Sequence, residues 1–449
     1  MPEYLYIIQK TLNSAQDGHT SSLGHWLLDI VENNWIPNGL APGIDSLSLK
    51  YTSKYIDFMN EKFSAKLDLG LTYTSGEYYN ILPFSYNGEK FPAAMKLISC
   101  NNINIHKQVK GMEELVSPLN WDRDNNRVYY ESFYKSPEIY QNNSLHLVFE
   151  DRERKRYKLS VSKQDTVTFL QKEKTKFGYN SPTDSLLTTH YFKDKRIVYM
   201  RLPMMIEKYG DSLSSRLKSI IHKNPVDAIV LDVRGNGGGS ERTYNNFLKK
   251  VLKDTLKVDL TLGRNFSPFY QKYLGINKDT IVKMSHLTFN VENVATLKKS
   301  NMFYIVMPDY TYVTPDSITY PFNGPIYILQ DRFIYSSTSN LSNLAKKTDK
   351  LISIGETPNL LGGLQTNPIP LSLPHSKFIF RVEPQIDFTN TKTTADVFQN
   401  NVEYPVNYSV EYLYERTTTE ENIYGKDFLL DKDPMFKKAL ELEKIRKKK

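Results

Sequence analysis

Residues 227–240 read Asp-Ala-Ile-Val-Leu-Asp-Val-Arg-Gly-Asn-Gly-Gly-Gly-Ser. The apolar, β-branched run 228–231 predicts a short strand that is buried on both faces. Four glycines within residues 235–239 end that strand. The apolar residues that follow recur at the spacing of one helix face, at Tyr244, Phe247, Leu248, Val251 and Leu252. The stretch therefore predicts a strand, a glycine turn and an amphipathic helix in succession, which indicates an α/β fold.

The glycine turn leaves backbone N–H groups that can hold an anion near the start of a helix. A dinucleotide-binding fingerprint needs glycine at its sixth position, where this chain has Ser240, and no Lys-Ser or Lys-Thr pair completes a phosphate-binding loop. The spacing therefore favours a developing oxyanion over a phosphate. The alternative is a tight turn without a chemical role, although such a turn rarely needs so many glycines.

The composition indicates a globular protein of more than one domain. A chain of 449 residues is long enough for two or three domains. The net charge is +8, but the basic residues are scattered, which disfavours nucleic-acid binding. The single cysteine, Cys100, excludes an intramolecular disulfide and a cysteine-based zinc site. No apolar stretch has the length of a membrane helix, and the first residues lack the pattern of a signal peptide.

A second strand, turn and helix are predicted about a hundred residues further on. The apolar run 325–330 predicts a buried strand, and Leu341, Leu344 and Ala345 have helical spacing. Between them, residues 335–339 read Tyr-Ser-Ser-Thr-Ser. A serine at such a corner exposes its hydroxyl as a nucleophile, while neighbouring amides can hold the negative charge formed on attack. The same serines also suit an ordinary helix N-cap.

Three segments carry a family resemblance. Residues 232–239 closely resemble the Asp-φ-Arg-Gly-Asn-Gly-Gly-Gly signature of the tail-specific, or C-terminal processing, serine peptidases and their tricorn-like relatives. Residues 335–339 resemble the nucleophile motif of this family, and residues 355–358, Gly-Glu-Thr-Pro, resemble a turn that follows it. Their order along the chain is also that of the family.

The resemblance implies a fold and a set of roles. The fold is α/β, with a crotonase/ClpP-like catalytic core, a PDZ-like β-rich domain and a small N-terminal helical region. Ser336 is the implied nucleophile, and the amides of Gly237, Gly238 and Ser337 are the implied oxyanion hole. The resemblance implies no metal and no cofactor.

The general base is also inferred from resemblance. Residues 16–20, Gln-Asp-Gly-His-Thr, resemble a segment of the histidine-using branch of the family, which implies His19 as the base. A histidine of a surface loop would have the same sequence context. The lysine-using branch carries its base at the position of Leu361, so a Ser–Lys dyad is excluded there. Three residues are open as the acid that orients the imidazole, namely Asp17, Glu383 and Asp396.

The chain is predicted to have four segments. They are a helical region at 1–66, a PDZ-like domain at 67–167, a linker at 168–192 and the protease core at 193–449. Within the first segment, the prolines and glycines of residues 26–43 predict an irregular connection. The PDZ-like segment lacks the glycine-rich carboxylate loop, so it is open whether it docks a peptide or only braces the core.

These observations predict a serine endopeptidase that acts on peptide or protein substrates. The alternative is a catalytically inactive pseudopeptidase that binds peptides or a partner protein, because Leu361 replaces the lysine and Ser339 replaces the glutamate of the family motifs. Nucleic-acid binding is a third, remote alternative that rests on net charge alone. The resemblance implies a periplasmic or cell-envelope protein from which a signal peptide was removed. The residues leave the substrate, the cleavage preference and the oligomeric state open.

Overall fold

The computed structural model describes residues 2–63, 65–180, 186–265, 302–358, 368–387 and 402–448. The chain forms two compact units. Unit 1 consists of Met1–Lys176, Asn367–Glu383 and Tyr408–Glu420, and unit 2 consists of Phe177–Thr366, Pro384–Asn407 and Glu421–Lys449. Two segments from the predicted protease core therefore group with the N-terminal part of the chain.

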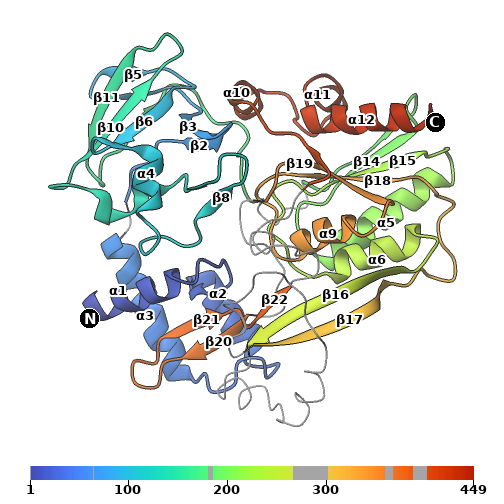
Figure 1. Cartoon of the computed structure of the whole chain (residues 1–449), viewed down its shortest axis with the longest axis horizontal. Helices are drawn as coiled ribbons and strands as arrows, with labels where there is room; N and C mark the ends of the chain where they lie inside the picture. The colour runs from blue at the N-terminus through green and yellow to red at the C-terminus, as the bar shows by residue number, and fades with distance from the viewer. Residues whose placement is uncertain are drawn as a thin grey trace. The chain divides into compact units, whose positions relative to one another are not determined.

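A six-stranded sheet forms the centre of unit 2 (Figure 1). In spatial order its strands are β13 (Thr189–Phe192), β14 (Ile197–Arg201), β15 (Ala228–Asp232), β18 (Ile326–Gln330), β19 (Leu351–Gly355) and β23 (Tyr404–Pro405). β13 is antiparallel to β14, and every following pair is parallel. β15 lies inside the sheet, and all its residues are buried, as its apolar sequence predicts.

Helices cover both faces of this sheet (Figure 1). One face is covered by α5 (Glu207–Ile221), α6 (Arg242–Val251) and α9 (Ser337–Ala345). On the other face α12 (Pro434–Arg446), which follows α11 (Lys426–Asp431), contacts β15, β18 and β19. The sheet is thus enclosed between two layers of helices, as expected for a parallel sheet.

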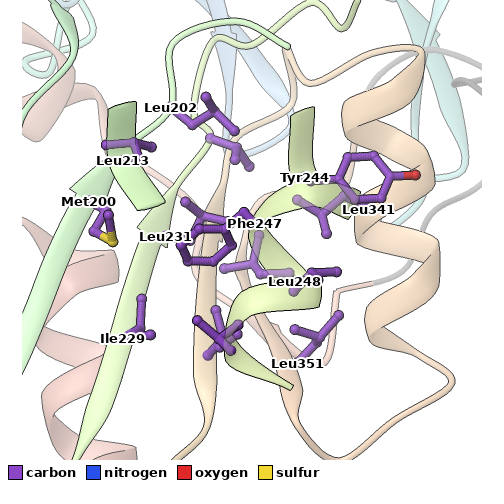
Figure 2. Packing of buried hydrophobic residues seen from close by; sticks show 14 of the residues in the cluster. Met200, Leu202, Leu213, Ile229, Leu231, Tyr244, Phe247, Leu248, Leu341 and Leu351 are labelled. Carbon is purple, nitrogen blue, oxygen red and sulfur yellow. The ribbon is translucent and has the colours of Figure 1, made fainter. Parts of the chain in front are cut away.

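An apolar core joins the sheet to α5, α6 and α9 (Figure 2). Ile229 and Leu231 of β15 point to this side, where Phe247 and Leu248 of α6 pack beside them. These four side chains are at most 3% exposed. Burial of each of these side chains stabilises the fold by about 1.5–3 kcal/mol before the entropy cost. Packing between β15 and α6 therefore holds the two ends of the predicted strand–turn–helix unit together.

The opposite face of the sheet packs on α12. Side chains alternate along a strand, so Tyr199 of β14 and Tyr327 of β18 point away from the core just described. The ring of Tyr199 lies 5.8 Å from that of Phe436, and the hydroxyl of Tyr327 donates to Glu443 at 3.2 Å. A second sheet of unit 2 has the order β17 (Met302–Val313), β16 (Leu256–Asn265), β22 (Gln385–Asp387).

The middle of unit 1 is rich in strands. Its larger sheet has the order β11 (Arg156–Val161), β10 (Leu145–Glu150), β6 (Lys96–Cys100), β3 (Glu77–Asn80), β2 (Leu71–Thr74), and β7 (Ile103–Asn104) pairs with β6. α4 (Ile105–Lys110) begins at an N-cap in which the side chain of Asn104 accepts from the amides of residues 106 and 107. Smaller elements are β12 (Thr168–Phe169), β4 (Phe84–Tyr86), β5 (Glu89–Phe91), β8 (Asn120–Asp122), β9 (Arg127–Tyr129), the 3₁₀ turns Phe133–Lys135 and Pro137–Ile139, and α10 (Val410–Thr418). A β-rich domain is therefore confirmed, and its PDZ-like character stays a prediction.

The N-terminal part of unit 1 is helical. It contains α1 (Pro2–Asn13), α2 (His25–Ile30), a π-helical turn (Val31–Trp35) and α3 (Ser46–Phe63). The prediction of an irregular connection over 26–43 is wrong in its first part, because Leu27, Leu28 and Val31 are buried on one helical face. A small sheet with the order β1 (Ser21–Ser22), β21 (Ile379–Val382), β20 (Ile369–Ser372) attaches the distant segment 369–382.

Candidate active site

The two predicted corners lie side by side in unit 2. β15 and β18 are parallel neighbours, and Asp232 pairs with Leu329, so the carboxyl ends of both strands meet at one edge of the sheet. Asp331 ties the corners together, because its Oδ1 accepts from the amide of Gly235 at 2.9 Å and from that of Phe333 at 3.1 Å. Residues from two distant segments thereby meet at one edge of the sheet.

Gly238 makes the closest approach between the corners. A Cβ atom added at Gly238 would lie 2.6 Å from the Cβ of Ser336 and 2.7 Å from the carbonyl oxygen of Tyr335. Gly238 also has a φ of +103°, which disfavours any residue with a side chain. The glycine turn therefore faces Ser336, and only glycine fits at its closest point.

Ser336 has an unusual backbone conformation, with φ +53° and ψ −128°. It occupies the N-cap position of α9, yet its side chain makes no capping hydrogen bond. The ordinary N-cap alternative is therefore wrong for Ser336. A positive φ in a residue with a side chain costs free energy, and such strain is concentrated at functional sites, where it aims a side chain.

The amides around this corner differ in their partners. The amide of Gly238 donates to Oδ1 of Asn236 at 2.9 Å, and Nδ2 of Asn236 donates to the carbonyl of Leu202 at 3.0 Å. Within the described part of the chain, the amides of Gly237 and Ser337 have no acceptor. Ser337 opens α9, where the first amides lack partners inside the helix. The amide of Gly238, which the resemblance places in the oxyanion hole, thus donates to Asn236.

Residues 179–180, which the sequence predicts to be part of a linker, lie against the glycine turn. Asn180 fixes the segment, because its amide donates to the carbonyl of Gly235 at 2.8 Å and its Nδ2 to the carbonyl of Arg234 at 2.9 Å. Tyr179 then lies over the turn, with its Cδ1 3.3 Å from a Cβ built at Gly237. No periodic pattern in the sequence points to this placement.

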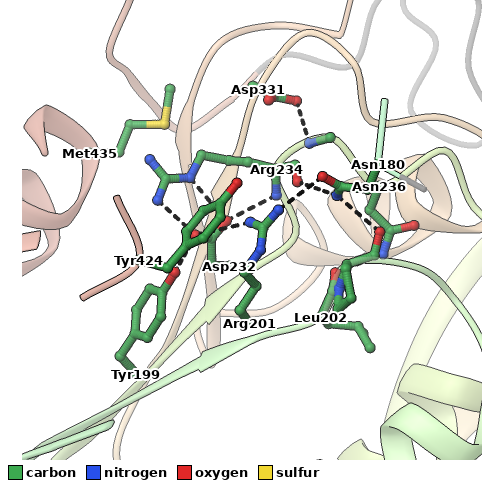
Figure 3. Close-up of polar contacts among 12 residues, drawn as sticks. Asn180, Tyr199, Arg201, Leu202, Asp232, Arg234, Asn236, Asp331, Tyr424 and Met435 are labelled. Atoms are coloured by element: carbon green, nitrogen blue, oxygen red, sulfur yellow. Dashed lines mark hydrogen bonds and ion pairs between the residues drawn. The ribbon is translucent and has the colours of Figure 1, made fainter. Parts of the chain in front are cut away.

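A network of buried charged side chains lies at the start of the glycine turn (Figure 3). Asp232 accepts from the hydroxyl of Tyr199 at 2.5 Å and from Nη2 of Arg234 at 2.7 Å, and Arg201 lies 3.5 Å away. The guanidinium of Arg201 also stacks on the ring of Tyr424, 3.7 Å from its centre. Burial alone would raise the pKa of Asp232, but the charges of Arg234 and Arg201 outweigh it and hold the pKa well below its ordinary value.

His19 belongs to unit 1 and is paired with an acid there. Its Nδ1 lies 3.4 Å from Oε2 of Glu383, and the two side chains are 10% and 4% exposed. The amide of Glu383 donates to Oγ1 of Thr20 at 3.1 Å, next to the pairing of β1 with β21. Asp17 contacts the backbone amide of His19 at 3.1 Å, not its ring. Of the three acids left open by the sequence, Glu383 is the one that contacts the imidazole, while Asp396 and also Leu361 lie outside the described residues.

The described residues contain no cluster of side chains suited to a metal ion. No helix in the described ranges has the length and apolar character needed to span a membrane.

The arrangement defines an α/β protein with a strained serine beside a glycine-rich turn, and comparison with known proteins agrees. Residues 196–397 match the model of peptidase family S41. Residues 196–397 are therefore similar to peptidase family S41, and the resemblance to tail-specific peptidases drawn from residues 232–239 is confirmed.

Solved structures are similar to the chain at low sequence identity. Mature CPAF complexed with lactacystin is 10% identical, with a TM-score of 0.50 over 94% of this chain and 96% of that chain. Another structure of mature CPAF is 10% identical, with a TM-score of 0.48 over 88% and 94% of the two chains. The photosystem II D1 C-terminal processing protease is 12% identical, with a TM-score of 0.33 over 80% and 76%. No curated protein matches the chain.

Proposed function

We propose that the chain is a serine endopeptidase that cleaves peptide or protein substrates with Ser336 as its nucleophile. The observation that carries the proposal is the close approach of Gly238 to a strained Ser336 whose side chain does not cap α9. A plain turn and a plain N-cap would need neither the strain nor the contact. The match to peptidase family S41 supports the same chemistry.

The oxyanion hole consists of the amides of Gly237 and Ser337. Ser336 Oγ attacks the carbonyl carbon of the scissile peptide bond, and the carbonyl oxygen becomes an oxyanion that these two amides stabilise. Because Gly238 has no side chain, the two corners can approach each other. Its amide donates to the side chain of Asn236. An acyl-enzyme forms when the C–N bond breaks, and water then hydrolyses the ester.

His19 is the general base in this proposal, and Glu383 orients its ring. The imidazole accepts the proton of Ser336 Oγ and later donates it to the leaving amine. The carboxylate of Glu383 lies against Nδ1, which leaves Nε2 as the nitrogen that exchanges the proton. Both side chains are buried, so little water competes for this contact.

A fluorophosphonate probe and two matched variants test the nucleophile. Ser336→Ala is expected to abolish labelling and peptide hydrolysis. Ser339→Ala is the control, because the hydroxyl of Ser339 donates to the carbonyl of Ile334 at 3.5 Å and has no role in the proposal. Labelling that persists in Ser336→Ala would exclude Ser336 as the nucleophile.

The same assay separates the enzyme from the pseudopeptidase. The sequence departures at Ser339 and Leu361 favour a binder that has lost activity. A folded wild-type protein that binds peptides but reacts with no probe would establish that alternative. Periplasmic or cell-envelope localisation is part of the proposal through the family resemblance, and fractionation of cells that express the full-length gene would test it.

A further inference from the structure

One carboxylate joins the glycine turn to the last helix. Asp433 is 1% exposed and precedes α12. Its Oδ1 accepts from the amides of Met435 at 3.0 Å and Phe436 at 2.9 Å, which caps the helix. Its Oδ2 accepts from Nη1 of Arg234 at 2.6 Å. One carboxylate oxygen of Asp433 therefore caps α12, and the other accepts from Arg234, which directly precedes the glycine turn.

Arg234 is held from several directions. Its Nε donates to Oδ1 of Asp232 at 2.9 Å and its Nη2 to Oδ2 of Asp232 at 2.7 Å, while Nη1 contacts Asp433. Its carbonyl accepts from Asn180 at 2.9 Å. Two carboxylates on one planar guanidinium leave the side chain a single geometry. The backbone at residue 234 is thus fixed directly before Gly235 (Figure 3).

The glycine turn cannot hold its own shape. Gly235, Gly238 and Gly239 have φ values of +71°, +103° and +136°, and glycine adopts many other values as readily. The directions of the amides therefore depend on contacts that hold the turn at several points, because the amide of Tyr335 donates to the carbonyl of Asn236 at 3.1 Å and that of Met205 to the carbonyl of Gly238 at 3.0 Å. Arg234 is the anchor at its start, and Asp433 is the part of that anchor that comes from outside the strand.

We propose that Asp433 is a positioning residue, which acts through Arg234 to hold the amide of Gly237 in the direction that stabilises the oxyanion. The proposal rests on the proposed function, since it concerns the reactivity of Ser336. Loss of the contact between Asp433 and Arg234 lets the turn move, and a displacement of about 1 Å can cost about a hundredfold in rate. The effect falls on the chemical step and not on peptide affinity.

A second buried acid on α12 provides a matched control. Glu443 is 2% exposed, pairs with Arg446 at 2.8 Å and accepts from Tyr327, and no contact of it with the glycine turn is described. Asp433→Asn and Glu443→Gln therefore make the same change of charge on the same helix. Asp433→Asn keeps a side-chain oxygen to cap α12. Arg234→Lys is a further test that keeps the charge but loses the planar fork.

The experiment measures melting temperature, and then the rate constant of fluorophosphonate labelling at a temperature where each variant is folded. Asp433→Asn and Arg234→Lys are expected to label about ten- to a hundredfold more slowly than wild type, with Glu443→Gln within about twofold. Equal slowing in Asp433→Asn and Glu443→Gln, or wild-type labelling in folded Asp433→Asn and Arg234→Lys, would overturn the positioning role alone. If Asp433→Asn does not fold, Arg234→Lys decides. A wild-type protein that is not labelled would overturn the proposed function and this inference together.

Discussion

The Cα of Gly238 lies so near Ser336 that an added Cβ would stand 2.6 Å from the Cβ of the serine. Real Cβ atoms do not approach one another so closely, so the two corners would have to separate. Gly238→Ala is therefore expected to destabilise the protein by about 1–3 kcal/mol through overpacking and backbone strain. It is also expected to abolish labelling of Ser336, because the oxyanion hole opens. Urea unfolding and probe labelling check the two effects.

Gly88→Ala is the control that separates the cost of backbone strain from the cost of the contact between Gly238 and Ser336. Gly88 has a φ of +82°, and a Cβ built there meets nothing within 4 Å. The substitution is expected to cost about 1 kcal/mol, from backbone strain alone, and to leave labelling unchanged. If both variants lost the same stability and both kept labelling, the contact between Gly238 and Ser336 would have no importance.

Glu383→Gln tests the acid that contacts His19. The expected result is a fall in kcat of about a hundredfold or more with a small change in KM, because the imidazolium loses its stabilising charge in the transition state. Asp17→Asn is the matched comparison, since the described contacts of the Asp17 side chain are with the backbone amide of His19 and the hydroxyl of Thr20, not with the imidazole. A larger loss in Asp17→Asn than in Glu383→Gln would reverse the assignment. Steady-state kinetics on one fluorogenic peptide suffices.

The free energy of unfolding is expected to fall in acid because Asp232 becomes protonated. The charges of Arg234 and Arg201 overcome burial and lower its folded pKa, so the ionised form contributes stability that is complete above the ordinary aspartate pKa. The free energy of unfolding should be level above about pH 5 and decrease steadily below about pH 4. Urea titrations across this range measure it.

High salt distinguishes this buried carboxylate from surface acids. Asp45 also has a lowered pKa, chiefly because Ser48 donates to it, and its exposed pair with Lys377 adds a part that salt can screen. Surface pairs are screened by salt, whereas a buried pair is screened far less. The decrease in acid should therefore persist in high salt. Its disappearance there would assign it to the surface.

Cys100 is expected to be inert in the folded protein. Burial raises the pKa of its thiol to about 12, and the residue is 0% exposed. Iodoacetamide at mildly alkaline pH should modify it only after unit 1 opens, in step with unfolding by urea. Mass spectrometry after a short pulse of reagent gives the modified fraction. Rapid modification without denaturant would show that this core opens locally.

The strand–turn–helix units could be predicted because their signals are local. The run 228–231 lies within β15, and the helical spacing from Tyr244 onward matches α6. Glycines and serines at the ends of two buried parallel strands must meet at one edge once the strands pair. The sequence thus contained the side-by-side placement of Gly238 and Ser336, although not their closeness.

Other features depend on contacts that no local sequence pattern indicates. Residues 369–382 group with unit 1 because β21 pairs with β1, which lies some 360 residues earlier. The bond between Asn236 and the amide of Gly238 spans two residues and is common for asparagine in turns. The sequence therefore offered a signal for the bond between Asn236 and Gly238, whereas the contact of Asp433 with Arg234 required the fold.

The bond from Arg234 to Asp433 joins residues that are 199 positions apart. During translation, Arg234 leaves the ribosome long before Asp433 has been added to the polypeptide. A nascent copy consequently carries Ser336 before the contact between Asp433 and Arg234 exists. On the positioning proposal, the chemical step in such a copy stays about ten- to a hundredfold slower until α12 docks.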